Sequence, residues 1–353
     1  MTGPRLTIAT IATSTPMGAE MYQNEIRGLA PAALRVVDDR SWRVRPLEVR
    51  SMRSDLPGNR RLPLGALSGA SVAVRRTLGR LLYGSSTVTH RMNLELPPAP
   101  HGDVITLHDV VAWRFPDESA PVHAAADEAR RAAAVICVSQ FSAQEAVDLL
   151  GVSDPVVVHN GVDDRFFDAR PLDERKLRDL GIGNRYVLHA GGAARRKNLE
   201  GLAQAWALIS RARPDLHLVL AGPPHPRRTE LFQRMPGTHL VGRVSDAVIP
   251  GLVAAAAAVV VPSLYEGFGL PVLEAMAAGT PVVAASTSSL PEVAGGAAIM
   301  VEPTGAAIAD GVVAATDEDP AVEMLIAAGR ERAKQFTWER SARAHARVWA
   351  SVA

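Results

Sequence analysis

A continuous apolar run at residues 254–261 is the sequence feature that most constrains the fold. A strand that is apolar throughout is buried on both faces, which is typical of a parallel sheet covered by helices. Pro271 then favours the start of a helix, and Gly279 favours its end. Between strand and helix lie Gly267 and Gly269, which let the main chain approach a ligand closely. The chain therefore contains a strand–glycine loop–helix unit of an α/β protein.

Two glutamates, Glu266 in this loop and Glu274 in the following helix, lie eight residues apart and can reach the same pocket. At the helix start, free backbone N–H groups and the positive end of the helix dipole favour an anionic ligand. Carboxylates accept hydrogen bonds from vicinal hydroxyl groups, which suits a hexose or a ribose. The alternative is an ordinary glycine-rich turn with two solvated glutamates. The strand–loop–helix context favours a sugar-nucleotide site.

The length of 353 residues exceeds one ordinary core and predicts two domains. Apolar residues make up 47% of the chain, but the longest apolar run, near residues 252–262, is about half of the roughly 20 residues that a membrane span needs. Residues 6–11 read as a first strand and lack the cationic start of a secretory signal. Cys137 is the single cysteine, so no intrachain disulfide can form. These features predict a cytoplasmic globular protein.

Short β-branched runs alternate with helical patterns along the chain, which predicts two doubly wound α/β domains. We expect strands at residues 6–11, 104–107, 135–138, 156–159, 186–190, 216–221, 259–262 and 281–285. We expect helices at residues 20–29, 67–83, 120–133, 142–149, 199–210 and 271–278. The boundary between the domains is expected near residues 163–171.

A second strand-to-helix site follows the strand at residues 186–190, where a pair of glycines precedes Arg196, Lys197 and Asn198. An arginine can bind a phosphate through two parallel hydrogen bonds, and a lysine acts as a compact point charge. Two cations beside free backbone donors therefore match a diphosphate. A solvated basic pair is the alternative, but the helix dipole disfavours cations at a helix start unless an anion joins them.

His108 follows the strand at residues 104–107, at the carboxyl end where open α/β sheets bind ligands. Asp109 is expected to orient the turn. A lone histidine is usually structural, so the surrounding motif decides between the two interpretations.

Several other classes of site are disfavoured. Asp317-Glu318-Asp319 spells a D-x-D metal motif but follows helix-like sequence, so an acidic helix start is the better interpretation. No histidine and cysteine cluster has zinc spacing, and Ser139 lacks the glycines of a hydrolase nucleophile turn. No G-x-G-x-x-G follows the first strand, which weakens a nicotinamide dehydrogenase interpretation.

The segment from Glu266 to Glu274 resembles the C-terminal signature of glycosyltransferase family 4, which contains retaining, sugar-nucleotide-dependent enzymes of the GT-B fold. Further stretches match the same family in the right order and span roughly residues 100–300. They are Thr106-Leu107-His108-Asp109, Val138-Ser139-Gln140-Phe141-Ser142, His159-Asn160-Gly161-Val162-Asp163, Arg196-Lys197-Asn198 and Val241-Gly242-Arg243-Val244.

The resemblance implies an α/β protein of the GT-B fold, with two doubly wound Rossmann-like domains facing a central cleft. Residues 1–166 would form the acceptor-binding domain and residues 167–335 the nucleotide-sugar-binding domain. Residues 336–353 would form a helix that crosses back to the first domain.

The resemblance also implies the roles of the site residues. His108 would lie beside the transferred sugar, with its carbonyl or imidazole near the oxocarbenium-like centre. Arg196 and Lys197 would neutralise the leaving nucleoside diphosphate, so that no metal and no cofactor is needed. At Gly18 the family commonly has two glycines where this chain has one. The expected catalytic residues are His108, Glu266 and Lys197, and the expected donor-binding residues are Gly18, Arg196, Lys197, Val244, Gly267, Phe268, Gly269, Leu270 and Glu274.

The implied reaction is the transfer of a hexosyl group from a nucleoside diphosphate sugar to a hydroxyl of a glycan, lipid-linked or small-molecule acceptor, with no nucleic acid as a partner. Similarity to bacterial mannosyltransferases of the family favours mannose or a related hexose. The family's favoured mechanism is a same-face substitution in which the departing phosphate deprotonates the acceptor. The alternatives are a UDP-N-acetylglucosamine 2-epimerase and a non-catalytic sugar-nucleotide-binding subunit. The intact Lys197, Glu266 and Glu274 argue against the subunit.

An arginine-rich segment, residues 40–91, holds 11 arginines but only two acidic residues. In its helical stretch at residues 67–83, Leu67, Val74, Leu78, Leu81 and Leu82 are expected on one face and Arg75, Arg76 and Arg80 on another. This pattern predicts contact with an anionic acceptor, or peripheral contact with an anionic membrane at its inner face. The alternatives are a solvated face on an arginine-rich sequence and a buried helix with a solvated rim, which gives the same periodicity.

Overall fold

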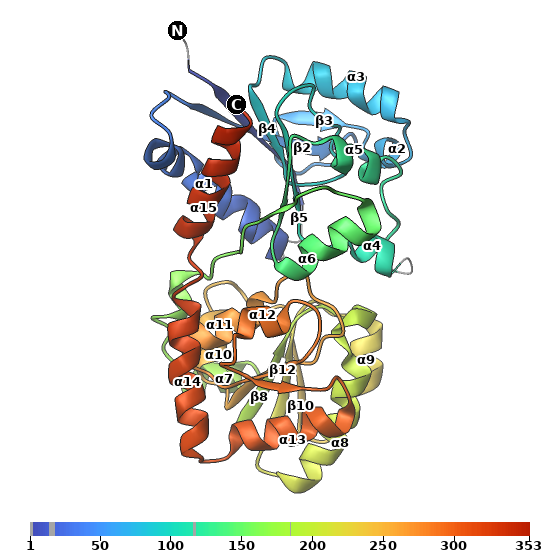
Figure 1. Cartoon of the computed structure of the whole chain (residues 1–353). Coiled ribbons are helices and arrows are strands. Elements are labelled where there is room, and N and C mark those ends of the chain that lie inside the picture. Colours follow the sequence, from blue (N-terminus) through green and yellow to red (C-terminus); the bar gives the residue numbers. More distant parts are fainter. Residues whose placement is uncertain (1–2, 14–17, 116–117, 184) are drawn as a thin grey trace. The chain divides into compact units, whose positions relative to one another are not determined.

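The computed structural model describes residues 3–13, 18–115, 118–183 and 185–353 (Figure 1). The chain divides into two compact units. Unit 1 consists of Met1–Gly161 and Trp338–Ala353, and unit 2 consists of Val162–Thr337. None of the helices within the described ranges is long and apolar enough to cross a membrane.

The chain passes from unit 1 to unit 2 after Gly161 and returns to unit 1 after Thr337, whereas the sequence predicted boundaries at residues 166 and 335. The backbone N–H of Val162 donates to the carbonyl of Phe336 at 3.0 Å, and Val162 forms a parallel bridge with Thr337. Both crossing segments are therefore paired within unit 2. This pairing places the boundaries at Gly161 and Thr337.

Unit 1 contains a parallel sheet of seven strands in the order β3-β2-β1-β4-β5-β6-β7. The strands are β1 (Arg5–Ile11), β2 (Arg43–Ser51), β3 (Arg60–Leu62), β4 (Val88–Arg91), β5 (Asp103–Leu107), β6 (Ala134–Cys137) and β7 (Val156–Val157). The helices are α1 (Gly18–Val37), α2 (Leu64–Ser68), α3 (Val72–Tyr83), α4 (Val111–Arg114), α5 (Ala125–Arg131), α6 (Gln140–Glu145), the π-helical turn η1 (Ala146–Leu150) and α15 (Trp338–Ser351).

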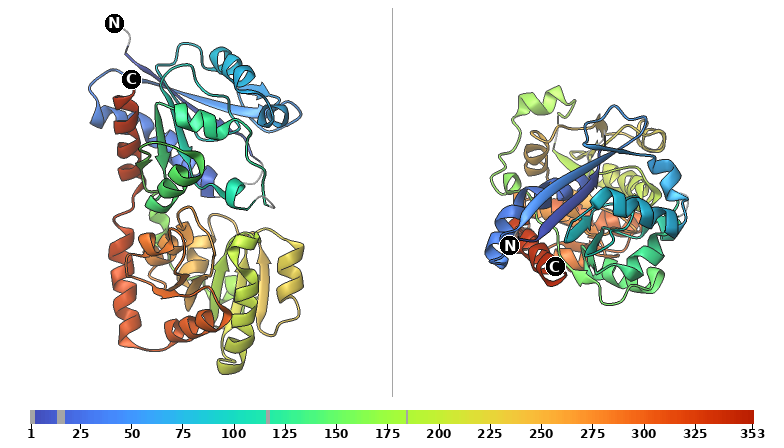
Figure 2. Two further views of the ribbon diagram at one scale, coloured as in Figure 1. Left: turned by 45° about the vertical axis from the view of Figure 1, so that its right-hand side comes forward. Right: turned by 90° about the horizontal axis from the view of Figure 1, so that it is seen from above.

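Side chains from alternate positions of these strands pack on the two faces of the sheet. Leu6, Ile8 and Val104 join the core beneath α1 and α15, whereas Ile105 and Leu107 join the core beneath α5 and α6. The C-terminal helix α15 lies beside α1, as Figure 1 and Figure 2 show, although their sequences are far apart.

Unit 2 contains a parallel sheet of six strands in the order β10-β9-β8-β11-β12-β13. The strands are β8 (Tyr186–Ala190), β9 (His217–Ala221), β10 (Thr238–Gly242), β11 (Ala258–Val261), β12 (Val282–Ala285) and β13 (Ile299–Val301). The helices are η2 (Asp164–Phe166), α7 (Glu174–Asp179), η3 (Arg195–Lys197), α8 (Leu199–Ala212), α9 (Pro226–Phe232), α10 (Ile249–Ala254), α11 (Leu270–Ala278), α12 (Leu290–Ala294), α13 (Gly305–Thr316) and α14 (Pro320–Ala333). Helices α8 and α13 pack on one core of the sheet, and α11 packs against β11, α10 and α14.

The central strands of unit 2 match their expected ranges closely, whereas five strands of the structure were not predicted. Strands β3, β10 and β13 are edge strands, and β2 lies next to an edge and alternates arginines with smaller residues. Edge positions have a polar side, so they lack the apolar signature of a buried strand. Strand β4 reads Val-Thr-His-Arg but is fully buried, and its His90 and Arg91 side chains are hydrogen-bonded inside the unit.

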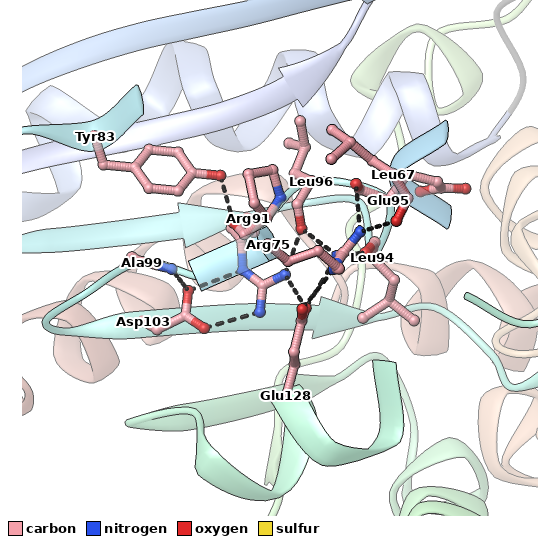
Figure 3. A network of polar contacts seen from close by, with 11 residues as sticks. Leu67, Arg75, Tyr83, Arg91, Leu94, Glu95, Leu96, Ala99, Asp103 and Glu128 are labelled. Carbon is pink, nitrogen blue, oxygen red and sulfur yellow. Dashed lines mark hydrogen bonds and ion pairs between the residues drawn. The ribbon is translucent and has the colours of Figure 1, made fainter. Parts of the chain in front are cut away.

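A network of two arginines and two carboxylates is buried beneath α3, as Figure 3 shows. Arg91 of β4 donates to both carboxylate oxygens of Asp103 at 2.9 and 2.8 Å and to Glu128 at 3.1 Å. Arg75 of α3 donates to both oxygens of Glu128 at 2.6 and 3.0 Å. These four residues are at most 7% exposed. Burial of these charges is possible because each has a partner of opposite sign.

The helix expected at residues 67–83 is therefore two helices, α2 and α3, and the placement of Arg75 on an exposed basic face was wrong. Arg75, Gly79 and Tyr83 recur every four residues and form the buried side of α3. A Cβ at Gly79 would lie 1.9 Å from the carbonyl oxygen of Pro98, so only glycine permits this close packing. The other side remains exposed and carries Val74, Arg76, Arg80 and Leu81.

Candidate functional site

The strand order of unit 2 reverses between β8 and β11, which are neighbours in the sheet. In open α/β sheets, ligands bind outside the carboxyl ends of the strands at such a switch point. The loop after β8 leads to η3 with Arg196 and Lys197, and the loop after β11 carries Ser263 and Glu266. The fold therefore brings together two motifs that lie far apart in the sequence.

Glu266 is the centre of a compact ionic cluster. Its carboxylate accepts hydrogen bonds from Lys197 Nζ at 2.6 Å and from Ser263 Oγ at 2.7 Å, and Arg196 Nη1 lies 3.5 Å away. The Lys197 and Glu266 side chains are 14% and 9% exposed. Burial raises the pKa of Glu266, but the opposing effect of Lys197 and Arg196 is larger and holds this pKa below its usual value. Glu266 is therefore ionised at neutral pH.

The loop that carries Glu266 is held by a group of small hydroxyl residues after β12. Ser288 Oγ accepts a hydrogen bond from the Glu266 backbone N–H at 2.9 Å. Ser289 Oγ donates to the carbonyls of Glu266 and Phe268 at 2.9 and 2.8 Å, and Thr287 Oγ1 donates to the carbonyl of Ser263 at 2.6 Å. These supporting residues could not be predicted from the sequence, because short hydroxyl side chains in a loop have no distinctive spacing.

The glycine loop ends where α11 begins. Gly269 has φ of 107°, in the left-handed region, and a Cβ there would lie 2.7 Å from Leu290. Phe268 is buried and packs edge-on to Phe336 at 6.0 Å between ring centroids, while Gly267 is buried and Leu270 is half-buried. Phe268 and Gly269 thus fix the turn into the helix.

Glu274 lies on α11 and makes no hydrogen bond or ion pair with the described residues. Burial raises the pKa of Glu274 to about 7, with a further increase from the carboxylate of Asp163 and an opposing effect of Arg165. A largely buried carboxyl group without a partner is suited to hydrogen bonds with a ligand.

Val244 lies in the loop after β10, the edge strand of the same sheet. It is half-buried, and two strands separate β10 from β11. Because the sheet is parallel, this loop leaves the same end of the sheet as the loops of Lys197 and Glu266.

His108 and Gly18 belong to unit 1. His108 follows β5, and its ring lies edge-on to Tyr22 of α1 at 4.6 Å between centroids. Its Nε2 atom is buried without a hydrogen-bond partner, and burial lowers the pKa of His108 to about 4, although Asp109 opposes this. The imidazole is therefore neutral at physiological pH. Gly18 is the first residue of α1, and the residues before it, 14–17, lie outside the described ranges.

The side chain that packs on His108 belongs to a buried hydrogen-bond chain. Tyr22 Oη lies 2.7 Å from Thr106 Oγ1 and 2.6 Å from His345 Nε2. His345 Nδ1 donates to the carbonyl of Ser341 at 2.8 Å, so its Nε2 accepts from Tyr22. This chain connects α1, β5 and α15 and immobilises the ring that lies against His108.

Acidic residues 317–319 lie at helix boundaries, between the end of α13 and the start of α14. Asp319 accepts a hydrogen bond from the backbone N–H of Ala321 at 2.8 Å and so caps α14. Over the described residues, no three histidine, cysteine, aspartate or glutamate side chains are close enough to hold a metal ion.

Two family models match this chain. A model described as "Glycosyl transferases group 1" matches residues 184–318, and one described as "Glycosyltransferase Family 4" matches residues 96–166. The first range contains the ionic cluster, and the second contains His108.

Curated relatives give the same assignment. O-antigen chain mannosyltransferase B of Escherichia coli is 32% identical over 305 residues, which cover 79% of this chain and 78% of the relative. A GDP-mannose-dependent alpha-(1-6)-phosphatidylinositol dimannoside mannosyltransferase of Mycobacterium tuberculosis is 32% identical over 150 residues, which cover 41% of this chain and 39% of that protein.

Solved structures share the fold. Anabaena Alr3699/HepE, solved in complex with UDP and glucose, superposes with a TM-score of 0.74 at 21% identity and covers 99% of this chain and 100% of its own. WaaG, a glycosyltransferase involved in lipopolysaccharide biosynthesis, has a TM-score of 0.69 at 15% identity, with 97% and 98% coverage. The GT-B fold expected from the sequence is therefore confirmed.

Proposed function

The chain belongs to glycosyltransferase family 4, and on this premise we propose that it is a retaining hexosyltransferase that uses a nucleoside diphosphate sugar and needs no metal ion. The single observation that supports this most strongly is the buried cluster of Lys197, Arg196 and Glu266 at the switch point of unit 2. Two cations and one carboxylate at the carboxyl ends of the strands support binding of a diphosphate and a sugar hydroxyl there.

The two cations act on the leaving group. As the glycosidic bond breaks, negative charge develops on the diphosphate, and preorganised cations in a partly buried site stabilise that charge. Lys197 Nζ and the Arg196 guanidinium are already held in place by Glu266 and the loop after β11. They supply the neutralisation that a divalent cation provides in other transferases.

The carboxylates and His108 act on the donor. Glu266 is ionised and takes hydrogen bonds from hydroxyl groups of the transferred sugar, whereas Glu274 takes them from the ribose. A neutral His108 offers its free Nε2 or its carbonyl to the sugar without adding repulsive positive charge at the oxocarbenium-like centre. The departing phosphate removes the proton of the acceptor hydroxyl on the same face, so no dedicated nucleophile takes part.

Mannose is the favoured hexose, because mannosyltransferases recur among the curated relatives. A panel of nucleotide sugars, including GDP-mannose and UDP-glucose, tests the donor by thermal stabilisation, since a ligand that binds the native state raises its stability by mass action. Release of nucleoside diphosphate in the presence of an acceptor, with retention at the anomeric carbon by NMR, tests the reaction. Conversion of the donor to an epimer without an acceptor would contradict transfer.

The acceptor is a glycan, a lipid-linked sugar or a small molecule bound by unit 1, and the enzyme acts in the cytoplasm at the inner face of the membrane. The exposed side of α3 supports membrane contact, because Val74 and Leu81 are 51% and 78% exposed beside Arg76 and Arg80. Apolar and basic side chains on one helix suit an anionic lipid surface.

A further inference from the structure

In the loop between β8 and η3, residues 191–194, most backbone carbonyl groups have hydrogen-bond partners among the described residues, whereas most backbone N–H groups do not. Its carbonyl oxygens are largely occupied: Gly191 O accepts from Arg228 Nη2, Ala193 O from Arg227 Nη1 at 3.1 Å, and Ala194 O from the backbone N–H of Lys197 at 3.0 Å. Two of these three bonds come from adjacent arginines at the start of α9.

Of the N–H groups in the same loop, only that of Gly191 donates to a described residue, at 3.0 Å to the carbonyl of Ala221. Among the residues that the structure describes, the backbone N–H groups of Gly192, Ala193 and Ala194 have no hydrogen-bond partner. Successive free N–H groups beside cations form the kind of concave backbone site that binds anions. The loop precedes Arg196 and Lys197 directly, so its donors and these cations belong to one region.

Arg228 is a buried cation without a counter-ion. It is 2% exposed, it bonds only to the carbonyls of Gly191 and Pro223, and its Nε atom is buried without a partner. No carboxylate within the described ranges forms an ion pair with it. An isolated buried charge is costly unless it is paired, so this arginine has unused capacity for an anion.

The charges of Arg228 and Lys197 also act on His189, which lies at the end of β8. Its Nδ1 donates to the carbonyl of Val260 at 3.2 Å, so its buried Nε2 is a bare acceptor without a partner. Burial, with a smaller effect of Arg228 and Lys197, lowers the pKa of His189 to about 4, whereas the hydrogen bond with Val260 and the charge of Glu266 oppose this. His189 is therefore a neutral side chain beside these charges.

We propose that Arg227 and Arg228 are positioning residues that hold loop 191–194 as a binding site for the diphosphate of the donor, and that Arg228 also adds its uncompensated charge to that site. This inference rests on the proposed function, because it takes a nucleoside diphosphate sugar as the donor. The two arginines occupy the loop carbonyls, and so leave the free N–H groups as the polar groups available to the phosphates.

Calorimetric titration with GDP, UDP, their nucleosides and inorganic pyrophosphate tests the proposal. Arg228→Gln should weaken binding of the preferred nucleoside diphosphate by about 10- to 100-fold, the effect of losing a charge-assisted contact, and leave nucleoside binding within about threefold. Arg227→Gln should weaken diphosphate binding by about threefold to tenfold, because Arg227 is partly exposed and also pairs with Glu200. Pyrophosphate should follow the diphosphates.

Arg234→Gln is the matched control, because Arg234 is exposed, lies just beyond α9 and makes no hydrogen bond to the described residues. It removes the same charge and should leave every affinity within about twofold. If Arg228→Gln does not fold, as judged by thermal unfolding, Arg227→Gln carries the test.

An equal loss of diphosphate and nucleoside affinity, or no loss, would overturn the inference while the proposed function stands. A wild-type protein that binds pyrophosphate, with the expected loss in the variants, but binds no nucleoside diphosphate would support the loop and reject the proposed function. A wild-type protein that binds neither would overturn both.

Discussion

The Lys197–Glu266 pair offers the sharpest test of the proposed mechanism. The two side chains meet at 2.6 Å and are 14% and 9% exposed, so solvent screens their charges only weakly. On the proposed function, Lys197 Nζ transfers its hydrogen bonds from Glu266 to the diphosphate, where they are strengthened as the leaving group gains charge. Lys197→Ala should therefore remove about 2–4 kcal/mol of transition-state stabilisation. This loss corresponds to a decrease in kcat/KM of about 30- to 700-fold.

The fold should survive this substitution. Glu266 would keep its hydrogen bond from Ser263 at 2.7 Å and its neighbour Arg196 at 3.5 Å, so the carboxylate would not be left unpaired. The loss of unfolding free energy should then be about 1–3 kcal/mol, below the 3–5 kcal/mol typical of a buried charge stripped of its partner. A native stability of about 5–15 kcal/mol accommodates that loss.

Steady-state kinetics with the identified nucleotide sugar provides the assay, and thermal unfolding confirms that each variant is folded. Lys176→Ala is the control, because the Lys176 side chain is 63% exposed and meets Asp173 only at 3.9 Å. It should leave kcat/KM within about twofold. A folded Lys197→Ala protein with the turnover of the wild type would refute the reasoning.

Five further experiments address the rest of the site and the exposed side of α3. Glu266→Gln should lower kcat more than affinity for the free nucleoside diphosphate, and an equal loss of both would restrict Glu266 to binding. The pKa of Glu274 is about 7 in the folded state, so the affinity for the nucleoside diphosphate should rise with pH through about 7. Glu274→Gln should abolish this rise. An affinity of the wild type that does not change with pH would reject the ribose assignment. Because the pKa of Glu274 is raised in the folded state, its protonated carboxyl group stabilises the fold below about pH 4.5, and this stability is lost as the pH rises through about 7. Over this pH range, the melting temperature of Glu274→Gln should therefore fall less than that of the wild type. EDTA should leave activity intact, whereas complete loss restored by magnesium or manganese would contradict the metal-free mechanism. Sedimentation with anionic liposomes should show salt-sensitive binding that the Arg76→Gln/Arg80→Gln double variant weakens by about 30-fold, at roughly 1 kcal/mol per basic residue, and no binding at low salt would favour a soluble acceptor.

The sequence predicted the parts of the fold whose physics is local. Strand β11 was found because a strand buried on both faces is continuously apolar, β8 because it is mostly apolar, and α11 because Pro271 and Gly279 mark its ends. Strand β4 was missed because its polar His90 and Arg91 are buried through partners on other elements. A residue-by-residue pattern cannot contain those partners.

Arg75 illustrates the same limit on α3. In the sequence it follows the helical period of a basic face, and it differs in no visible way from Arg76. It is buried because Glu128 of α5 and several backbone carbonyls receive its donors. The choice between a solvated and a buried arginine is made by tertiary contacts, so it could not be predicted from periodicity.

In the candidate site, sequence motifs predict the residues expected to bind the donor, whereas the residues that orient them are found only from their contacts in the structure. The cations, the glutamates and the glycines carry recognisable motifs, because their chemistry requires particular residue types. The residues that orient them, such as Ser288, Ser289 and Tyr22, act through geometry that many sequences could supply. Supporting residues of this kind become visible only when hydrogen bonds are traced in three dimensions.

Within the described part of the chain, some of the groups that lack a protein partner are those that would meet the donor on the proposed function. They include the Nε2 atom of His108, the carboxyl group of Glu274, the Nε atom of Arg228 and the backbone N–H groups of residues 192–194. Leaving a buried polar group unsatisfied costs about 1–3 kcal/mol, and native proteins keep few such groups. On the proposed function, the sugar, the ribose and the diphosphate supply the missing partners. A nucleotide at about 100 times its Kd should then stabilise the protein by about 2.7 kcal/mol, because it binds the native state and not the unfolded chain.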